Sequence, residues 1–228
     1  LYGSRLDLYV NSVLLVSVTN DRVTIGTLGI RQTGGSSANF LAEIASPPPT
    51  TNVTLPFSDQ FNRPNSSFIG SNWTERIGDV KIQDGKMALN TNGTAIVTVN
   101  GPQVADVSVS SDIDLTRQAG ANSSIGLLAR WSGPGDSNAY MARLLRTADD
   151  LYFVQVWRNP GMGWEFLAQG QVNTGSGRLR FDVVGTTLRA YYNNTLIVTT
   201  TDSIIRRAGM VGYRHSGGLA GSFEAHVA

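Results

Sequence analysis

The amino-acid sequence predicts an all-β protein built as a sandwich of antiparallel strands. Short segments rich in Val, Ile, Thr and aromatic residues follow one another along most of the chain, and apolar and polar residues alternate in "VSVSSDIDL", residues 107–115. Turn sequences such as "QDGK", "SGPGDSN" and "RNPGMG" separate these segments. No segment keeps an apolar stripe with the helical period over several turns. Regularly spaced strands without helices are typical of a β-sandwich or a barrel.

The first predicted element, residues 1–45, is a partial copy of the end of the chain. Residues 26–45 align with residues 209–228 at a constant spacing of 183 positions, and eight of the twenty aligned residues are identical. Upstream, residues 6–20 align with residues 188–202 at a spacing of 182. A one-residue change of spacing is typical of an insertion in a turn, so the sequence indicates an internal repeat. We therefore expect residues 1–45 to be the C-terminal strands of a preceding, incomplete copy of the same domain.

The second predicted element is a linker over residues 46–56, "SPPPTTNVTLP". Three consecutive prolines favour an extended polyproline II conformation, and the Thr- and Asn-rich run after them has little apolar surface to bury. Residues 57–228 then form the one complete domain. A domain of this length buries roughly 70% of its unfolded surface, so its core needs neither a metal nor a disulfide.

Composition excludes several classes of function. The chain has no cysteine, which rules out a disulfide framework and a thiolate zinc site. A net charge of +1 with both signs scattered gives no basic stripe for nucleic acid. No run approaches the ~18 consecutive apolar residues that a membrane-spanning helix needs.

Four stretches carry a resemblance to a known family. "FSDQFNRPNSSFIGSNWTERIGDVKIQDGKMAL" and "IGLLARWSGPGDSNAYMARL" resemble the opening and the middle strands of concanavalin A-like, laminin-G-like jelly-roll domains of bacterial extracellular proteins. "LRFDVVGTTLRAYYNNTLIVTTTD" resembles a strand pair of these domains that ends in a short turn and Asp, and "GMVGYRHSGG" resembles their closing strands. The resemblance covers residues 57–228 and again residues 6–45. It implies a jelly-roll β-sandwich, a tandem-repeat context and a place at the cell surface. It also implies ligands that are saccharides or calcium.

Aromatic and planar polar side chains concentrate in residues 130–164. Saccharide binding needs aromatic faces for the apolar faces of sugar rings and planar groups for the hydroxyls. We expect Arg130, Arg143 and Gln155 on a solvent-facing sheet, with an aromatic residue at its rim. The full set of candidate carbohydrate-binding residues is Arg130, Arg143, Gln155, Trp157, Trp164 and Tyr140. The structural alternative is that Trp73 and Trp131 belong to the core and the arginine stems cover a sheet face.

Two further kinds of site are predicted. The resemblance implies that Asp59, at the entry of the complete domain, helps to hold a structural calcium ion; a plain turn aspartate is the alternative. Asn-x-Ser/Thr sequences mark candidate glycosylation sites on turns and the linker. These asparagines are Asn52, Asn65, Asn72, Asn92, Asn122 and Asn193.

Catalytic groups are not evident. Laminarinase-type relatives use a Glu-x-Asp-x-x-Glu strand, which this chain lacks. Asp112 and Asp114 share one face of a predicted strand, but aspartates that alternate with Val and Ile more often form a solvated face. His215 and His226 align with Gln32 and Glu43 of the earlier copy, so they are not shared by all units. A binding or structural protein is therefore expected, with a glycoside hydrolase-like activity as the alternative.

The incomplete first copy limits how the protein can be organised. Its strands carry apolar faces and open edges that need partners. The missing strands belong either to an upstream part of a long tandem array, or to a neighbouring molecule that the segment completes by strand addition, which would propagate into a filament. We expect an extracellular, repeat-built structural or adhesive protein whose units bind glycans. The alternative is a carbohydrate-binding module of a secreted glycoside hydrolase.

Overall fold

The computed structural model describes residues 5–10, 13–19, 33–36, 50–90 and 92–228. It divides into two compact units, Leu1–Pro49 and Thr50–Ala228. The second unit is a sandwich of two antiparallel β-sheets, which confirms the predicted fold class. Among the described residues, no helix is long and apolar enough to cross a membrane.

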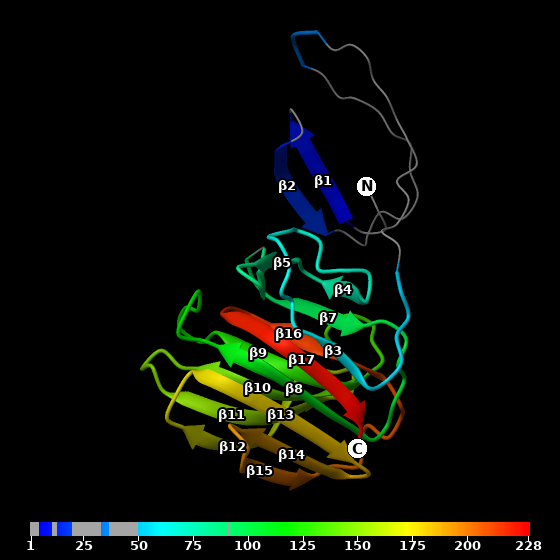
Figure 1. The fold of residues 1–228 in the computed structure, drawn as a ribbon, viewed down its shortest axis with the longest axis vertical. Helices are drawn as coiled ribbons and strands as arrows, with labels where there is room; N and C mark the ends of the chain where they lie inside the picture. Colours follow the sequence, from blue (N-terminus) through cyan, green and yellow to red (C-terminus); the bar gives the residue numbers. More distant parts are fainter. Residues whose placement is uncertain (1–4, 11–12, 20–32, 37–49, 91) are drawn as a thin grey trace. The chain divides into compact units, whose positions relative to one another are not determined.

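One layer of the sandwich is a seven-stranded sheet (Figure 1). β9 and β10 pair in register near its middle, and β16 is inserted between β9 and β7. In spatial order the strands are β12 (Glu165–Val172), β11 (Tyr152–Asn159), β10 (Ala139–Arg146), β9 (Ser124–Trp131), β16 (Met210–His215), β7 (Ala95–Val99) and β4 (Trp73–Ile77).

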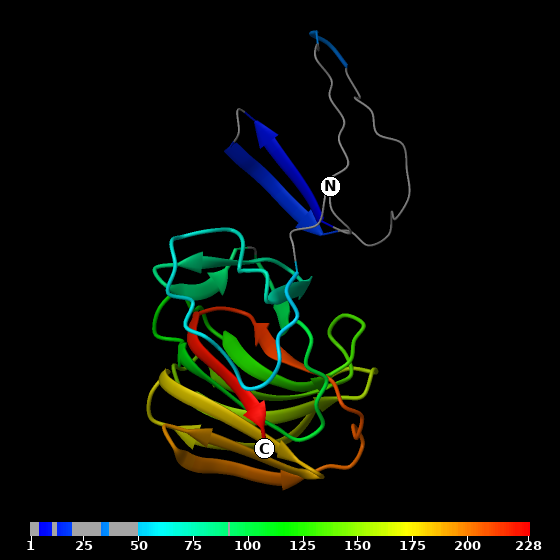
Figure 2. The ribbon, with the colours of Figure 1, turned by 45° about the vertical axis from the view of Figure 1, so that its right-hand side comes forward.

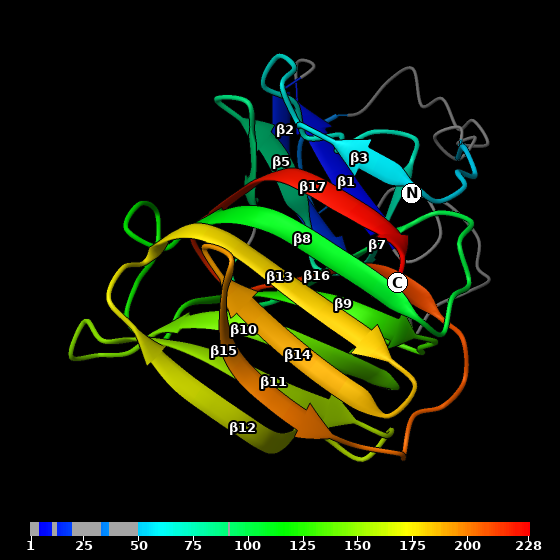
Figure 3. The same ribbon diagram turned by 60° about the horizontal axis from the view of Figure 1, so that its bottom comes forward.

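The other layer is an eight-stranded sheet, which lies in front of the first in the view of Figure 3. Its hairpin-connected strands β13, β14 and β15 can also be followed, in yellow to orange, in Figure 2. In spatial order the strands are β15 (Thr195–Thr201), β14 (Thr187–Tyr192), β13 (Ser176–Val184), β8 (Val107–Asp114), β17 (Leu219–Val227), β6 (Lys86–Leu89) and β5 (Val80–Gln83), and β3 (Phe57–Asp59) also pairs with β17.

The core lies between the two sheets and follows from strand alternation. Val107, Val109 and Ile113 of β8 are buried on one face, as the alternating pattern predicts. Ser111 shares that face, and its hydroxyl donates to the carbonyl oxygen of Gly221 at 2.8 Å and accepts from Tyr213 at 2.8 Å. The polar group is therefore satisfied inside an apolar layer.

An aromatic cluster closes the core near the start of the second unit. The ring of Trp73 lies 4.9 Å from that of Phe223, 5.5 Å from that of Phe61 and 5.8 Å from that of Tyr213. Trp73 is therefore a core residue, as the structural alternative predicted.

In the first unit, β1 (Arg5–Val10) and β2 (Val13–Thr19) form an antiparallel hairpin. Its strand bounds match those of the β14–β15 hairpin when 182 is added to each residue number. Both hairpins have a register shift, between Leu8 and Tyr9 in the first and between Ala190 and Tyr191 in the second. The rest of the aligned copy, residues 26–45, lies outside the described residues except for 33–36.

The second half of the predicted linker contacts the sandwich. The backbone N–H of Thr51 donates to the carbonyl oxygen of Ser71 at 2.8 Å, and that of Val53 donates to Asn100 at 2.9 Å. Val53 and Leu55 pack against the core. The first half, residues 46–49, lies outside the described residues.

Candidate functional site

Several of the predicted binding residues lie on the face of the seven-stranded sheet that points away from the core. We call this face the outer face. On β11, Val154 and Val156 belong to the core, so the intervening Gln155 and its neighbour Trp157 point outward. On β10, Ala142 and Leu144 are core residues, so Arg143 also points outward. Arg143 and Gln155 lie directly opposite each other in the pairing of these two strands.

A second apolar cluster lies on the outer face and includes Trp131, which is only 6% exposed. A β-bulge positions this residue: Met210 pairs with Trp131, whereas Gly212 pairs with Leu128, so β9 has one extra residue opposite β16. The extra residue reverses the alternation, and Trp131 turns outward. Trp131 is buried, as the structural alternative predicted, but in this outer cluster rather than between the sheets.

The same bulge turns Arg130 inward. The expectation that Arg130 lies on a solvent-facing sheet is therefore wrong. Arg130 has a φ of 55° and is 2% exposed. Its guanidinium donates to the carbonyl oxygens of residues 105, 185 and 205 at 2.6–2.7 Å. Every side of the group is used within the protein, so Arg130 joins three loops and presents nothing to a ligand.

The prediction that Tyr140 binds carbohydrate is also wrong, because the residue is fully buried between the sheets. Its hydroxyl donates to Asp202 Oδ1 at 2.5 Å and accepts from the backbone N–H of Ile205 at 3.0 Å. Burial, assisted by the hydrogen bond to Asp202, raises the pKa of Tyr140 to about 12. The residue anchors the segment after β15 and is not available for stacking.

Four outward-facing side chains form a connected polar group, which we call the Arg143 cluster: Arg143, Gln155, Trp157 and Gln169. Gln155 Oε1 accepts from Arg143 Nε at 2.9 Å and from Trp157 Nε1 at 3.0 Å. Gln155 Nε2 donates to Gln169 Oε1 at 2.7 Å. The guanidinium carbon of Arg143 lies 4.8 Å from the Trp157 ring centroid, within the range of a cation–π interaction. The cluster therefore holds an indole, a guanidinium and two amides in one fixed arrangement.

The charge of Arg143 is only partly hydrated. Burial, and secondarily the positive charge of Arg214, lowers the pKa of Arg143 to about 10. The group is still a cation at neutral pH. Next to it, Phe166 packs edge-on against Trp157 with ring centroids 5.3 Å apart and is 49% exposed. This pair extends the aromatic surface to the edge strand β12.

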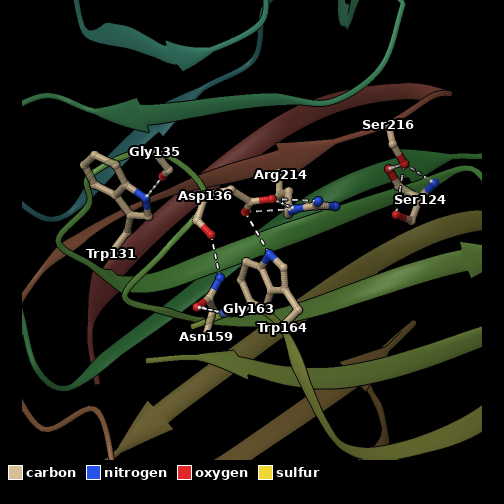
Figure 4. Close-up of polar contacts among 9 residues, drawn as sticks. All are labelled: Ser124, Trp131, Gly135, Asp136, Asn159, Gly163, Trp164, Arg214 and Ser216. Carbon is tan, nitrogen blue, oxygen red and sulfur yellow. Dashed lines mark hydrogen bonds and ion pairs between the residues drawn. The ribbon is translucent and has the colours of Figure 1, made fainter. Parts of the chain in front are cut away.

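The loop of residues 132–138 is attached to the outer face through Asp136 (Figure 4). Asp136 Oδ2 accepts from Arg214 Nη2 at 2.7 Å and from Nε at 2.9 Å, and Asp136 Oδ1 accepts from Trp164 Nε1 at 2.8 Å. The guanidinium carbon of Arg214 lies 5.6 Å from the Trp164 ring centroid. Trp164 is thus positioned by a carboxylate and an arginine that the sequence did not place among the carbohydrate-binding candidates. The identity of Arg31 and Arg214 in the internal alignment was a signal for Arg214.

Asp59 lies in a different arrangement, beside the aromatic cluster of the core. Its Oδ1 accepts from the Phe61 N–H at 2.8 Å and from Arg63 Nη1 at 2.7 Å, and its Oδ2 accepts from Trp73 Nε1 at 2.8 Å. Burial opposes ionisation, but these hydrogen bonds and the charge of Arg63 outweigh it and hold the pKa of Asp59 below its ordinary value. A calcium ion at this carboxylate would have to displace these donors. In the described part of the chain, no group of three or more His, Asp or Glu side chains could hold a metal ion.

The candidate glycosylation sites are accessible to different degrees. Asn52, Asn65, Asn92, Asn122 and Asn193 are exposed, and Asn72 is half-buried. Asn65 Oδ1 accepts from the backbone N–H of Asp84 at 2.7 Å, and Asn193 Oδ1 accepts from that of Arg178 at 2.9 Å. Glycosylation at all six stays a prediction.

A cleft of about 550 Å³ shares no residue with the Arg143 cluster, and its lining includes Asn90, Asn92, Gln118, Ser123 and Ser216. Ser216 is tied to β9: its backbone N–H donates to the carbonyl oxygen of Ser124 at 2.8 Å, and its hydroxyl accepts from the Ser124 N–H at 2.9 Å (Figure 4). Apart from Leu89, the described residues that line the cleft are amides, hydroxyls and glycines, and none of them is aromatic or charged. Because saccharide recognition depends on aromatic faces, the outer face is the better candidate site.

Comparison with known proteins gives a fold but no family. No protein-family model matches the chain, and no curated protein matches it. Among solved structures, the carbohydrate-binding module CBM66 from Bacillus subtilis is 17% identical, with 68% of this chain and 93% of that chain covered and a TM-score of 0.55. A Bacillus subtilis protein with a galectin-like fold is 10% identical, with 75% and 94% covered and a TM-score of 0.56. A GH43 protein from Bacillus licheniformis is 14% identical, with 79% and 41% covered and a TM-score of 0.56.

Identities this low establish architecture alone. The second unit has the jelly-roll fold of galectin-like domains, which is the fold that the sequence resemblance implied.

Proposed function

We propose that the sandwich is a glycan-binding domain and that it binds through the outer face of its seven-stranded sheet. The observation that carries this proposal is the Arg143 cluster, in which Arg143 stacks on Trp157 while Gln155 hydrogen-bonds both. An indole face can cover the apolar face of a sugar ring, and amide and guanidinium groups can bond its hydroxyls. The likeness of the fold to a carbohydrate-binding module supports this assignment.

Preorganisation strengthens the argument. Exposed arginine and glutamine side chains normally lose rotamer freedom on binding, which costs about 0.5–1.5 kcal/mol for each side chain. Here Gln155 is only 8% exposed and is fixed by three hydrogen bonds. Part of that ordering has therefore already taken place in the free protein.

The test is a glycan array followed by titration calorimetry on every glycan that binds. We expect Trp157→Ala and Arg143→Ala to weaken binding about tenfold or more, which corresponds to ~1.4 kcal/mol. The matched control is the pair Arg180 and Tyr191 on the eight-stranded sheet, where an arginine also stacks on a ring, at 3.8 Å. Arg180→Ala and Tyr191→Ala should leave binding unchanged. Equal losses in both pairs, or binding that survives Trp157→Ala, would rule out the outer face.

For the wider context we propose an extracellular, repeat-built structural or adhesive protein. The observation in favour is the agreement between the β1–β2 and β14–β15 hairpins in bounds, register and position of the register shift. Such agreement is what two copies of one unit would have. The role is binding and assembly without catalysis, and copies of the unit, in the same chain or in a neighbouring one, are the expected partners.

The alternative context is a carbohydrate-binding module of a secreted glycoside hydrolase. The mass and assembly state of the native protein separate these possibilities, by intact mass spectrometry and negative-stain imaging. A tandem array gives a much larger chain of beads, and strand addition gives filaments of a chain near 24.4 kDa. A single sandwich joined to a catalytic domain supports the module, and a discrete monomer of this mass contradicts both assemblies.

A further inference from the structure

The arginines of the outer face are short of counter-ions. Three half-buried arginines lie on this face: Arg76, Arg143 and Arg214. Arg214 is paired with Asp136. Arg76 instead contacts Thr98 Oγ1, Met210 Sδ and the Trp131 ring, and Arg143 contacts Gln155 and the Trp157 ring. Within the described residues, neither Arg76 nor Arg143 forms an ion pair with a carboxylate.

The opposite sheet differs in this respect. Its half-buried arginines, Arg178 and Arg180, are both paired with carboxylates. Arg178 lies 3.1 Å from Asp112 and 2.8 Å from Glu224, and Arg180 lies 3.3 Å from Asp182. Among the described residues, unpaired half-buried guanidinium groups therefore lie on the outer face.

An unpaired, partly buried cation has an energetic cost that a ligand anion can relieve. Burial lowers the pKa of both Arg76 and Arg143, which shows that their cationic forms have lost hydration. A guanidinium in this state gains more from a charged acceptor than from a neutral hydroxyl. The site is therefore better matched to an oxyanion than to an uncharged sugar.

The geometry of Arg143 indicates where the anion would bind. Its Nε is already bonded to Gln155 Oε1, and no described residue accepts from its two terminal nitrogens. These nitrogens form one edge of a planar fork, which suits the two-point binding of a carboxylate or a sulfate. Stacking on Trp157 holds the fork in place. The outer face already contains one such arrangement of a carboxylate with a guanidinium. The carboxylate of Asp136 accepts hydrogen bonds from both Arg214 and the indole N–H of Trp164.

We infer that the ligand of the outer face is an acidic saccharide, whose carboxylate or sulfate group pairs with the terminal nitrogens of Arg143 while a sugar ring covers Trp157. This inference rests on the proposed function and adds the chemical class of the ligand. The two sources of the anion, uronate and sulfate, are separated by the experiment.

The experiment titrates the full chain with three pairs of probes by calorimetry. The pairs are oligogalacturonate and the same oligosaccharide after carboxyl reduction, dextran sulfate and dextran, and a heparin oligosaccharide before and after desulfation. We expect at least one probe to bind about tenfold or more tightly than the partner from which its carboxylates or its sulfates are missing. Arg143→Gln should remove this preference, Arg143→Lys should retain part of it, and the matched variant Arg180→Gln should leave it intact. Affinity should also fall as salt increases.

Each outcome has a defined meaning. A preference for oligogalacturonate identifies a carboxylate, and a preference for only the sulfated probes identifies a sulfate. If reduced oligogalacturonate and dextran bind as tightly as oligogalacturonate and dextran sulfate, and Trp157→Ala removes this binding, the inference is overturned and the proposed glycan-binding function stands. No binding of any probe or array glycan overturns the proposed function as well. Near-UV circular dichroism of each variant confirms that lost binding is not lost folding.

Discussion

Asp136 and Arg214, which lie 78 residues apart in the chain, form a two-point ion pair on the outer face of the seven-stranded sheet. The pair fixes the loop of residues 132–138 to β16, and the same carboxylate orients the indole of Trp164. This long-range contact therefore helps to position both the loop and Trp164 on the outer face.

Asp136→Asn should lower the free energy of unfolding by about 1–2 kcal/mol, because it weakens an ion pair that is only partly exposed. The control is Asp150→Asn, which breaks the more exposed pair with Arg146 and should cost about 0.5 kcal/mol or less. Urea unfolding of both variants measures the difference. Equal effects would mean that the Asp136–Arg214 pair contributes no more than an ordinary surface pair.

Arg130→Met should be far more destabilising, by about 3–5 kcal/mol, because it removes a buried guanidinium on which the carbonyl oxygens of three loops depend for a donor. Arg130→Lys should not restore stability, since one ammonium group cannot reach acceptors arranged around a planar guanidinium. The exposed Arg206, which also donates to a carbonyl oxygen, is the matched control as Arg206→Met. A loss below about 1 kcal/mol at Arg130 would contradict a structural role.

Gly212→Ala should destabilise the protein by about 2–4 kcal/mol. A Cβ atom at this position would overlap the carbonyl oxygen of Val97 and lie 2.8 Å from Thr98 Cα, so the backbones of β16 and β7 would have to separate. Gly120→Ala is the control, because its Cβ would meet only Ser123 Oγ, at 3.9 Å. Thermal unfolding compares the two. An unchanged melting temperature for Gly212→Ala would show that the strands can move apart freely.

His215 should make stability depend on pH. The residue is fully buried, and burial lowers its pKa from 6.5 to about 4. As pH falls, the unfolded chain takes up this proton first, so the contribution is complete above pH 6.5 and is lost progressively down to about pH 4. The loss is at most on the order of 3 kcal/mol. His215→Gln should flatten the stability curve in this window, and His226→Gln should not; parallel curves for wild type and His215→Gln would be the contrary result.

Two measurements on Asp59 distinguish a structural role of its carboxylate from a role as a calcium ligand. Asp59→Asn should lower stability by about 2–3 kcal/mol, because it weakens bonds to Arg63, Trp73 and the Phe61 N–H. The wild-type contribution should be present above the ordinary pKa of a carboxyl and should disappear as pH falls through the lower folded value. Melting temperatures with added calcium and with a chelator should agree within error. A calcium-dependent rise that Asp59→Asn abolishes would instead establish the metal site.

The fold class was predictable because strand signals are local. Alternating residues and turn sequences identify strands without knowledge of their partners. The placement of Arg143 beside Gln155 follows from the same logic, since both lie near the centres of consecutive strands joined by a short turn. This part of the candidate site could be predicted from the sequence.

Arg130 and Tyr140 could not be placed in this way. The β-bulge opposite Val211 reverses the inward and outward alternation of side chains on β9. No residue type in "LLARW" indicates a bulge. On β10, Ala139 and Met141 on one face are as apolar as Tyr140 and Ala142 on the other, because an apolar cluster covers the outer face as well. Alternation alone therefore could not tell inside from outside. Asp136 and Arg214 were missed because their contact joins distant parts of the chain.

The central positions of β16 and β17 have a consequence for how the protein is made. Each sheet consists of two groups of strands that only residues 210–228 bring together, β16 between β9 and β7 and β17 between β8 and β6. While the ribosome is still translating the preceding residues, both sheets have unpaired edges at the places where their middle strands belong. Hairpins such as β13–β14 can form during synthesis, but the sandwich closes only after residues 210–228 have been made, through contacts of large sequence separation. A nascent chain stalled before β16 would therefore expose unpaired backbone edges in the middle of both sheets, where strands of other chains could pair.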